Sequence, residues 1–248
     1  MTRTFLLGSY VDALTMKETL NKVEAIIRIG KPVQHVVINA SKINLMAQNE
    51  ELADIVNASP LINADGQSIV WAMKFLGHEV QERVAGIDLF ENLVKLSAEK
   101  GFRVYYFGAQ EDVVQEVVQL HQQKYPNLQV AGYRNGYFDE VESEEIAMDI
   151  RKSKADIVFV AFSSPKKEQW VHAHKEMMGA PFVMGVGGSF DVIAGVTKRA
   201  PQWMQKAGLE WFYRFMQEPR RMFKRYFVGN LSFVRKVMKE RWRKKDVR

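Results

Sequence analysis

Five short segments of polar or small residues each follow an apolar run in this sequence of 248 residues. Backbone N–H groups at the start of a following helix favour an anion such as a diphosphate. Such turns also occur for tight geometry alone, so each segment by itself is more typical of structure than of binding. The five together predict a nucleotide or phosphate ligand. They are Asn39-Ala40-Ser41, Asn63-Ala64-Asp65-Gly66, Gly108-Ala109, Ser163-Ser164-Pro165 and Gly187-Gly188-Ser189.

The apolar runs before these segments are typical of buried strands, because they are nearly continuous and rich in β-branched and aromatic residues. The predicted strands are 33–39, 103–107, 156–162 and 181–186, with weaker ones near Leu61 and Gln129. Helical patterns lie between them at about 14–29, 41–57, 67–76, 88–100, 110–124, 142–153 and 166–178. This alternation predicts an α/β fold with a mainly parallel sheet flanked by helices. Ligands of such sheets bind beyond the carboxyl ends of the strands, where the five segments lie.

The composition excludes several kinds of chemistry. The chain has no cysteine, which rules out disulfides, thiolate metal sites and cysteine nucleophiles. The N-terminus lacks a signal-type apolar region, and no run of 18 or more apolar residues occurs. We therefore expect a soluble chain without a membrane-spanning segment.

Basic residues are concentrated near the C-terminus. Residues 1–197 carry 19 basic and 25 acidic side chains, whereas residues 198–248 carry 16 basic and 4 acidic ones. The net charges are therefore −6 and +12. This asymmetry predicts a core at 1–197 and a basic appendage at 198–248 that binds an anionic partner, either a nucleic acid or a membrane surface. A solvated basic terminus is the alternative.

The appendage contains a predicted helix at 203–217 and, after Pro219, a second helical pattern. Aromatic and aliphatic residues recur there at helical spacing among basic ones, which is typical of an amphipathic helix on an anionic membrane. Packing of the apolar side on the core is the alternative, and both can hold at once. The apolar residues are Phe223, Tyr226, Phe227, Leu231, Val234, Val237 and Met238, and the basic ones are Arg220, Arg221, Lys224, Arg225, Arg235, Lys236 and Lys239.

An ordered set of motifs from about residue 5 to residue 225 resembles the WecG/TagA/CpsF glycosyltransferases. No single motif is specific, but the ordered set is. The resemblance implies a Rossmann-like glycosyltransferase core and a helical appendage that meets the membrane and closes over the active site. The motifs are Val36-Val37-Ile38-Asn39-Ala40, Ala64-Asp65-Gly66, Arg83-Val84-Ala85-Gly86-Ile87-Asp88-Leu89, Gly136-Tyr137-Phe138, Ser164-Pro165-Lys166-Lys167-Glu168-Gln169, Gly185-Val186-Gly187-Gly188-Ser189-Phe190-Asp191, Lys198-Arg199-Ala200-Pro201, Gly208-Leu209-Glu210-Trp211, Arg214 and Glu218-Pro219-Arg220-Arg221.

The resemblance also implies a reaction. Family members transfer a sugar with inversion from a UDP-sugar, typically UDP-N-acetylmannosamine, to a sugar on undecaprenyl diphosphate, for teichoic acid or other bacterial surface polysaccharides. They act in the cytoplasm, peripherally bound to the inner face of the cell membrane. Family members also associate with one another, which leaves a homo-oligomer as an open alternative for this chain. Members differ in the sugar, so transfer of glucose or glucuronic acid in exopolysaccharide assembly is an alternative.

Two other classes of protein are alternatives to this reaction. A Rossmann dehydrogenase needs a Gly-x-Gly-x-x-Gly turn after its first strand, where this chain has Asn39-Ala40-Ser41-Lys42-Ile43. A nucleic-acid-binding protein is supported by the basic tail alone, and the acidic core argues against it.

Inverting transfer needs a base for the acceptor proton and positive charge for the leaving diphosphate. Asp65 follows a predicted strand and matches the proposed base of the family, while a helix cap or Asx turn is its alternative role. Asn39 matches a family position near that Asp and the substrate. Family members often carry Thr two positions before that Asn, where this chain has Val37, so its substrate preference can differ.

Arg83 matches an active-site arginine of the family and could neutralise a diphosphate, or it could form a surface ion pair with Glu79 or Glu82. Gln169 could hydrogen-bond the sugar or the nucleotide, or it could be an exposed helix residue.

UDP is expected to bind near Gly187, Gly188 and Asp191. The glycines would let the backbone approach the nucleotide, and Asp191 could accept a hydrogen bond from ribose or uracil, or cap the next helix. Tyr137 could stack on the base or belong to the core.

Arginines of the appendage are candidates for binding the lipid diphosphate or the leaving UDP, because a guanidinium pairs bidentately with phosphate. Arg214 and Arg221 are the first of these, followed by Arg220 and Arg225. The chain has no Asp-x-Asp pair, and His172 and His174 would point to different faces of a predicted helix. We therefore expect no metal site and no cofactor.

Overall fold

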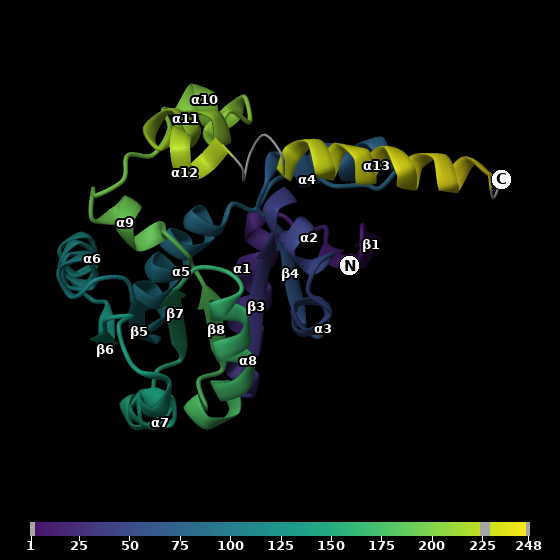
Figure 1. Ribbon diagram of the computed structural model, residues 1–248. Helices are drawn as coiled ribbons and strands as arrows, with labels where there is room; N and C mark the ends of the chain where they lie inside the picture. Colours follow the sequence, from purple (N-terminus) through teal and green to yellow (C-terminus); the bar gives the residue numbers. More distant parts are fainter. Residues whose placement is uncertain (1–2, 224–228, 247–248) are drawn as a thin grey trace.

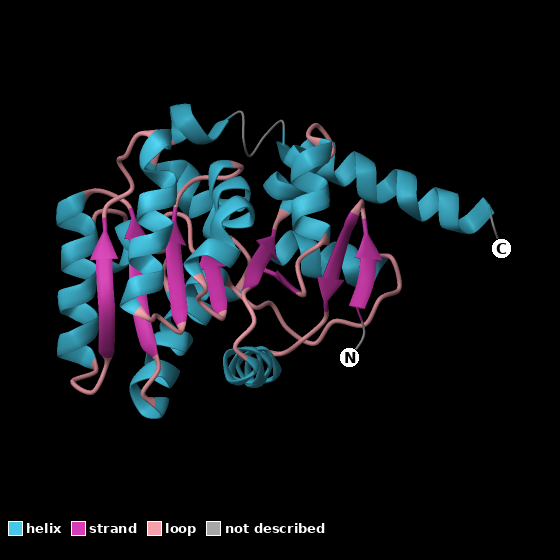
Figure 2. Cartoon of the chain, turned by 90° about the horizontal axis from the view of Figure 1, so that it is seen from below, coloured by secondary structure: helices cyan, strands magenta, loops and turns pink. Residues whose placement is uncertain are grey.

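Nearly continuous apolar runs form a central sheet in the computed structural model, which describes residues 3–223 and 229–246. The strands of the sheet are β3 (Val33–Ile38), β4 (Leu61–Ala64), β5 (Arg103–Gly108), β6 (Gln129–Arg134), β7 (Ile157–Ala161) and β8 (Phe182–Gly185). All neighbours pair in parallel, in the order β4-β3-β8-β7-β5-β6. Figure 2 shows the strands side by side with helices around them. The predicted α/β fold and its six strands are confirmed.

Helices cover both faces of the sheet, because successive strand residues point to opposite sides. The helices are α1 (Met16–Ile29), α2 (Ala40–Met46), α3 (Glu50–Asn57), α4 (Gln67–Phe75), α5 (Gly86–Lys100), α6 (Glu111–Lys124), a 3-10 turn (Glu140–Glu142), α7 (Ser143–Ser153), α8 (Lys166–Met178), α9 (Ser189–Ile193), α10 (Gln202–Lys206), α11 (Glu210–Gln217), α12 (Pro219–Phe223) and α13 (Gly229–Asp246). Side chains of α1, α5 and α6 share one core with Tyr106, Phe159 and Met184. Side chains of α7 and α8 share another with Tyr105 and Val158. Burial on both faces explains the continuous apolar runs.

Two predicted helices are each broken in two, so the prediction of continuous helices over 41–57 and 203–217 was wrong. The first break precedes α3, where the Asn49 side chain accepts a hydrogen bond from the Leu52 N–H at 2.8 Å and caps the new helix. The second lies at Gly208, whose φ of 73° is the left-handed conformation that ends a helix. A methyl group at Gly208 would also lie 2.8 Å from Gln67 Cγ.

A short antiparallel hairpin, β1 (Arg3–Leu6) and β2 (Ser9–Asp12), precedes the sheet and was not predicted. Leu7 and Gly8 form its turn with φ values of 50° and 89°, as tight two-residue hairpins require. Asp12 fastens the hairpin to the sheet, because it accepts a hydrogen bond from the Ile62 N–H of β4 at 2.8 Å and pairs with Arg3 at 3.0 Å.

The last helix, α13, packs against α2 and then extends away from the sheet (Figure 1). Phe233 and Val237 are buried in a cluster with apolar residues of α2. Asn44 of α2 donates to the Gly229 carbonyl at 2.7 Å and accepts from Lys236 Nζ at 2.9 Å. Part of the apolar side therefore packs on the core, whereas Leu231, Val234 and Met238 are exposed. Tyr226, Phe227, Lys224 and Arg225 lie outside the described residues.

Candidate active site

The five polar segments gather at one edge of the sheet, because each follows the carboxyl end of a parallel strand. The strands β4, β3 and β8 are adjacent, so their loops, which carry Asp65, Asn39 and Gly187, are consecutive along this edge. Open α/β sheets bind their ligands at this position.

The carboxylate of Asp65 is held by donors on both of its oxygens. Oδ1 accepts a hydrogen bond from the Gly86 N–H at 2.7 Å, and Oδ2 accepts one from Asn39 Nδ2 at 3.4 Å. Gly66, not Asp65, is the N-cap of the following helix α4, so the carboxylate satisfies the first N–H of α5 instead. Each oxygen keeps a further lone pair, so the carboxylate can still accept a proton.

Asn39 links this carboxylate to the start of α2. Its Oδ1 accepts the Lys42 N–H at 3.0 Å and caps the helix, which leaves the amide nitrogen to face Asp65. Val37 lies beside them, since a methyl group at Gly86 would be 3.7 Å from Val37 Cγ2 and 3.6 Å from Asp65 Oδ1. The position at which Thr was expected from the family resemblance is therefore apolar at the centre of this site.

Arg83, which precedes α5, pairs with a carboxylate from the C-terminal segment. Its Nη1 lies 3.2 Å from Glu210 Oε2, 127 residues away in the sequence, whereas Glu79 or Glu82 was the partner suggested by proximity. Arg199 reaches the other oxygen of Glu210 through Nε at 3.4 Å and binds Asp88 through Nη1 at 2.6 Å. Burial lowers the pKa of Arg199, but the two carboxylates outweigh burial and hold that pKa above its ordinary value.

A buried charge cluster that the sequence reasoning missed lies beneath this edge. Glu168 in α8 pairs with Lys42 of α2 and with Lys167, whose Nζ is 2.8 Å from Glu168 Oε1. The Ser164 hydroxyl donates to the same oxygen at 3.1 Å and accepts from Lys167 at 2.5 Å. A methyl group at Gly185 would lie 2.7 Å from the Lys167 side chain, so glycine there lets the lysine pack against β8.

Burial and charge act in opposite directions on this cluster. Burial raises the pKa of Glu168, but the ammonium groups of Lys42 and Lys167 outweigh it and bring the pKa down to about 2. Burial lowers the pKa of Lys167 to about 8, with a further contribution from Lys42. Glu168 is therefore ionised at neutral pH, and it fastens α2, which Asn39 caps, to the first turn of α8.

Three of the residues predicted to bind the nucleotide, Gly187, Gly188 and Asp191, follow β8, the strand beside β3. Gly187 and Gly188 connect β8 to α9, and Gly187 has a φ of 56°. Asp191 lies in the first turn of α9, and a methyl group at Gly188 would be 3.5 Å from its Oδ2. The backbone can approach a ligand closely at these glycines. Their binding role stays a prediction.

Two further predicted site residues lie on α8 and after β6, the edge strand opposite β4. Gln169 donates through Nε2 to Glu51 Oε2 of α3 at 3.0 Å. Tyr137 is 71% exposed in the loop after β6. Since β4 and β6 are opposite edge strands of a six-stranded sheet, about 24 Å separate the strand ends that precede Asp65 and Tyr137, at the usual spacing of ~4.8 Å.

The C-terminal arginines that were predicted to bind phosphate lie in two short helices. Arg214 is half-buried in the last turn of α11, and Arg220 is exposed in α12. Arg221 also lies in α12, but its side chain, like Arg225, is outside the described part of the chain.

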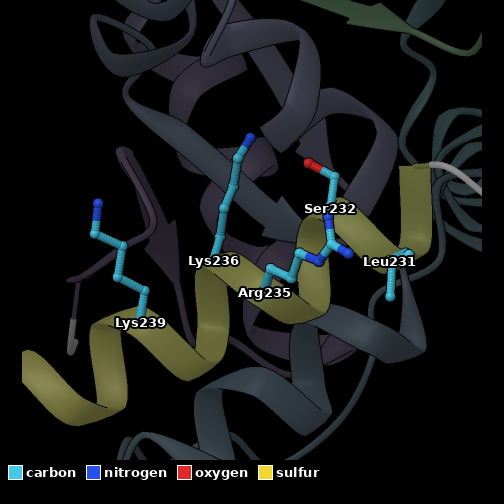
Figure 3. Close-up of a pocket in the computed structure, with 5 residues that line it drawn as sticks. All are labelled: Leu231, Ser232, Arg235, Lys236 and Lys239. Atoms are coloured by element: carbon cyan, nitrogen blue, oxygen red, sulfur yellow. The ribbon is translucent and has the colours of Figure 1, made fainter.

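The described residues of α13 form a basic surface. A pocket on this helix is lined by Leu231, Ser232, Arg235, Lys236 and Lys239, as Figure 3 shows. Exposed apolar residues, among them Trp242 at 61%, lie on the same helix. In residues 3–223 and 229–246, no helix is long and apolar enough to cross a membrane. Within the same residues, no group of three or more His, Asp or Glu side chains is arranged to hold a metal ion.

The protein is a Rossmann-like α/β protein, because helices cover both faces of its parallel sheet. A carboxylate and arginines lie at the carboxyl edge of the sheet, where such proteins bind their ligands. Residues 4–247 match the Glycosyl transferase WecG/TagA/CpsF family, and this chain belongs to that family of glycosyltransferases.

Curated relatives agree with this assignment. The chain is 32% identical over 239 residues to a protein of Bacillus subtilis strain 168, covering 96% of this chain and 89% of the relative. It is 34% identical over 192 residues to a Bacillus spizizenii protein, covering 77% and 73%. It is 30% identical over 219 residues to a Staphylococcus aureus MW2 protein, covering 88% and 85%. Each relative is named N-acetylglucosaminyldiphosphoundecaprenol N-acetyl-beta-D-mannosaminyltransferase.

Proposed function

We propose that this chain transfers an N-acetylmannosaminyl group, with inversion, from a UDP-linked donor to N-acetylglucosamine on undecaprenyl diphosphate. The names of three relatives that match most of the chain support the sugar and the acceptor. The position of the Asp65 carboxylate, held by Gly86 and Asn39 at the carboxyl edge of the sheet, carries the proposal.

In the proposed mechanism Asp65 takes the proton from the acceptor hydroxyl as general base. The hydroxyl oxygen forms a bond to the anomeric carbon while the bond from that carbon to the UDP oxygen breaks, so UDP leaves with the electron pair. Asn39 keeps the carboxylate oriented, because its own amide is fixed by the Lys42 N–H. Arg83 supplies positive charge for the departing diphosphate, and Arg214 and Arg221 add to it from the C-terminal segment.

We propose that no divalent metal is needed, because guanidinium groups and backbone N–H groups can meet the charge of the leaving diphosphate. Gly187 and Gly188, which follow the strand beside β3, are the proposed backbone donors, and Asp191 is the proposed partner of ribose or uracil. Gln169, which bonds Glu51, is a proposed hydrogen-bond partner of the sugar or nucleotide, and Tyr137 would contact only a part of the substrates that extends away from Asp65.

We also propose that the protein binds the inner face of the cell membrane through its C-terminal segment. The lipid-linked acceptor resides there, and α13 carries Arg235, Lys239 and Arg243 beside the exposed Leu231 and Trp242. Basic side chains near an anionic surface contribute about 1 kcal/mol each. No observation favours binding to nucleic acid over binding to lipid.

A donor screen tests the reaction. The purified chain is incubated with a synthetic polyprenyl-diphosphate N-acetylglucosamine and single UDP-sugars, with and without EDTA, and the products are read by mass spectrometry. We expect N-acetylmannosamine transfer that EDTA does not abolish. Transfer of glucose or glucuronic acid alone would refute the proposed sugar, and loss of activity in EDTA would refute metal independence.

The Asp65→Asn variant tests the base. Its Oδ1 can still accept the Gly86 N–H, while the new amide cannot take a proton, so we expect turnover to fall about 10²- to 10⁴-fold with UDP binding largely retained. Asp149→Asn is the matched control, because Asp149 is a half-exposed carboxylate on α7 paired with Lys152. Full turnover in Asp65→Asn would remove Asp65 as the base.

A further inference from the structure

Two guanidinium groups from distant parts of the chain share one carboxylate in this structure. Arg83 lies before α5, and Arg199 lies between α9 and α10. They bind the two oxygens of Glu210, at 3.2 Å through Arg83 Nη1 and at 3.4 Å through Arg199 Nε. Glu210 begins α11, and its carboxylate lies between Arg83, which precedes α5, and Arg199, which precedes α10.

Arg199 has more donors than this arrangement uses. Its Nη1 binds Asp88 at 2.6 Å, yet its Nη2 is buried and has no hydrogen-bond partner among the described residues. An unsatisfied buried donor is costly, and a ligand with several acceptor oxygens would remove that cost. With Glu210 in place, the side chains of Arg83 and Arg199 are only 15% and 26% exposed, so the pair is shielded from water in this state.

The arginine pair is linked to the proposed base through the segment that begins α5. Gly86, whose N–H binds Asp65, is three residues after Arg83 and two residues before Asp88, the partner of Arg199. Both arginines are therefore attached to the segment that begins α5 and orients the Asp65 carboxylate.

We propose that Arg83 and Arg199 together form a binding site for a diphosphate group, and that the Glu210 carboxylate occupies this site when no ligand is bound. The inference rests on the proposed function and adds Arg199 as a binding residue and Glu210 as its competitor. Carboxylate and phosphate oxygens suit the same planar guanidinium fork, and a diphosphate offers more oxygens and more charge than one carboxylate. Ligand binding requires Glu210 to withdraw, which couples occupancy of the site to the position of α11.

Binding of UDP to the full chain, measured by titration calorimetry, tests the site, with uridine as the probe that lacks phosphate. We expect Arg199→Gln to weaken UDP binding about tenfold or more and to leave uridine binding unchanged. Arg199→Lys keeps the charge but loses the planar guanidinium, so its affinity for UDP should lie between those of the wild type and Arg199→Gln. Glu210→Gln has the opposite effect and tightens UDP binding, because the competing charge is gone. Arg28→Gln, which breaks an exposed pair with Glu24 on α1, is the control and changes nothing.

The opposite changes in UDP affinity of Arg199→Gln and Glu210→Gln distinguish a binding effect from a folding effect, because a variant that merely damages the fold does not bind UDP more tightly. Diphosphate is present in both substrates, so the KM of each is measured as well. A raised acceptor KM with unchanged UDP binding in Arg199→Gln would assign the site to the lipid diphosphate. Unchanged UDP affinity and unchanged acceptor KM, or weaker UDP binding in Glu210→Gln, would overturn the inference. Failure of the wild-type chain to transfer sugar would refute the proposed function, while the UDP titrations would still decide the site.

Discussion

Removal of the Glu168 carboxylate should strongly destabilise the fold, because Glu168 compensates two buried ammonium groups. Its side chain is 2% exposed, and those of its partners Lys42 and Lys167 are 4% and 11% exposed. Breaking a buried ion pair by removing one partner costs about 3–5 kcal/mol. For a chain of this length that corresponds to a fall in Tm of about 6–20 °C. The variant is Glu168→Gln, which keeps the size of the side chain.

The cost should also depend on pH. Burial holds the pKa of Lys167 at about 8, and the Glu168 carboxylate keeps it from falling further. In Glu168→Gln the folded-state pKa of Lys167 is lower still. The full loss of folding free energy from its unpaired ammonium group therefore applies only at pH values below that pKa. Above pH 8 Lys167 is neutral in both folded proteins, and its share of the difference between them disappears. Glu168→Gln should therefore be more destabilising at pH 6 than at pH 9.

Urea unfolding followed by circular dichroism at pH 6 and pH 9 measures both effects. The matched control is Asp149→Asn, which breaks the exposed pair with Lys152 and should cost less than about 1 kcal/mol at either pH. A cost below about 1 kcal/mol for Glu168→Gln, or an equal cost at the two pH values, would refute this account of the cluster.

Two further predictions concern acid stability and membrane binding. Burial lowers the pKa of His35 to about 4, although its hydrogen bond with Asn63 opposes the shift. The stability that the neutral ring contributes is fully present above pH 6.5 and is lost as the pH falls toward 4. The loss is at most about 3 kcal/mol. Thermal melts of wild type and His35→Gln between pH 7 and pH 4.5 check this, and equal slopes would contradict it. Substituting Arg235, Lys239 and Arg243 by Gln should weaken binding to phosphatidylglycerol vesicles, measured by co-sedimentation, by about 3 kcal/mol. The Tm should not change. The control variant loses three exposed basic side chains of the core instead, Lys17, Arg28 and Lys95, and should bind the vesicles as wild type does. Equal sedimentation of the two variants would count against the C-terminal segment as the lipid-binding part.

The sequence predicted the sheet well because strands buried on both faces leave a strong signal. Runs such as Ile157-Val158-Phe159-Val160 have no polar face, and the structure buries them completely. The parallel arrangement then required the loops after them to meet at one edge, which placed Asn39 and Asp65 together. The hairpin of β1 and β2 escaped because two strands of four residues give too short a pattern.

The contacts within the candidate site were less predictable, because they join residues far apart in the sequence. Lys42 and Glu168 are charged residues on predicted helices, where solvent exposure is the ordinary expectation, yet the fold buries both. The pairing of Arg83 with Glu210 spans 127 residues and depends on the break at Gly208, which turns α11 toward the core. Phe233, buried against α2, was absent from the predicted apolar side of the last helix.

The seating of α13 on α2 has a consequence for chimeric enzymes. The helix that receives Phe233 and Val237 is the same seven-residue helix whose first turn is capped by Asn39. Asn44, which holds the start of α13, lies little more than one helical turn from that cap. An exchange of C-terminal segments between family members would thus fail as a modular swap unless the matching α2 travelled with the graft.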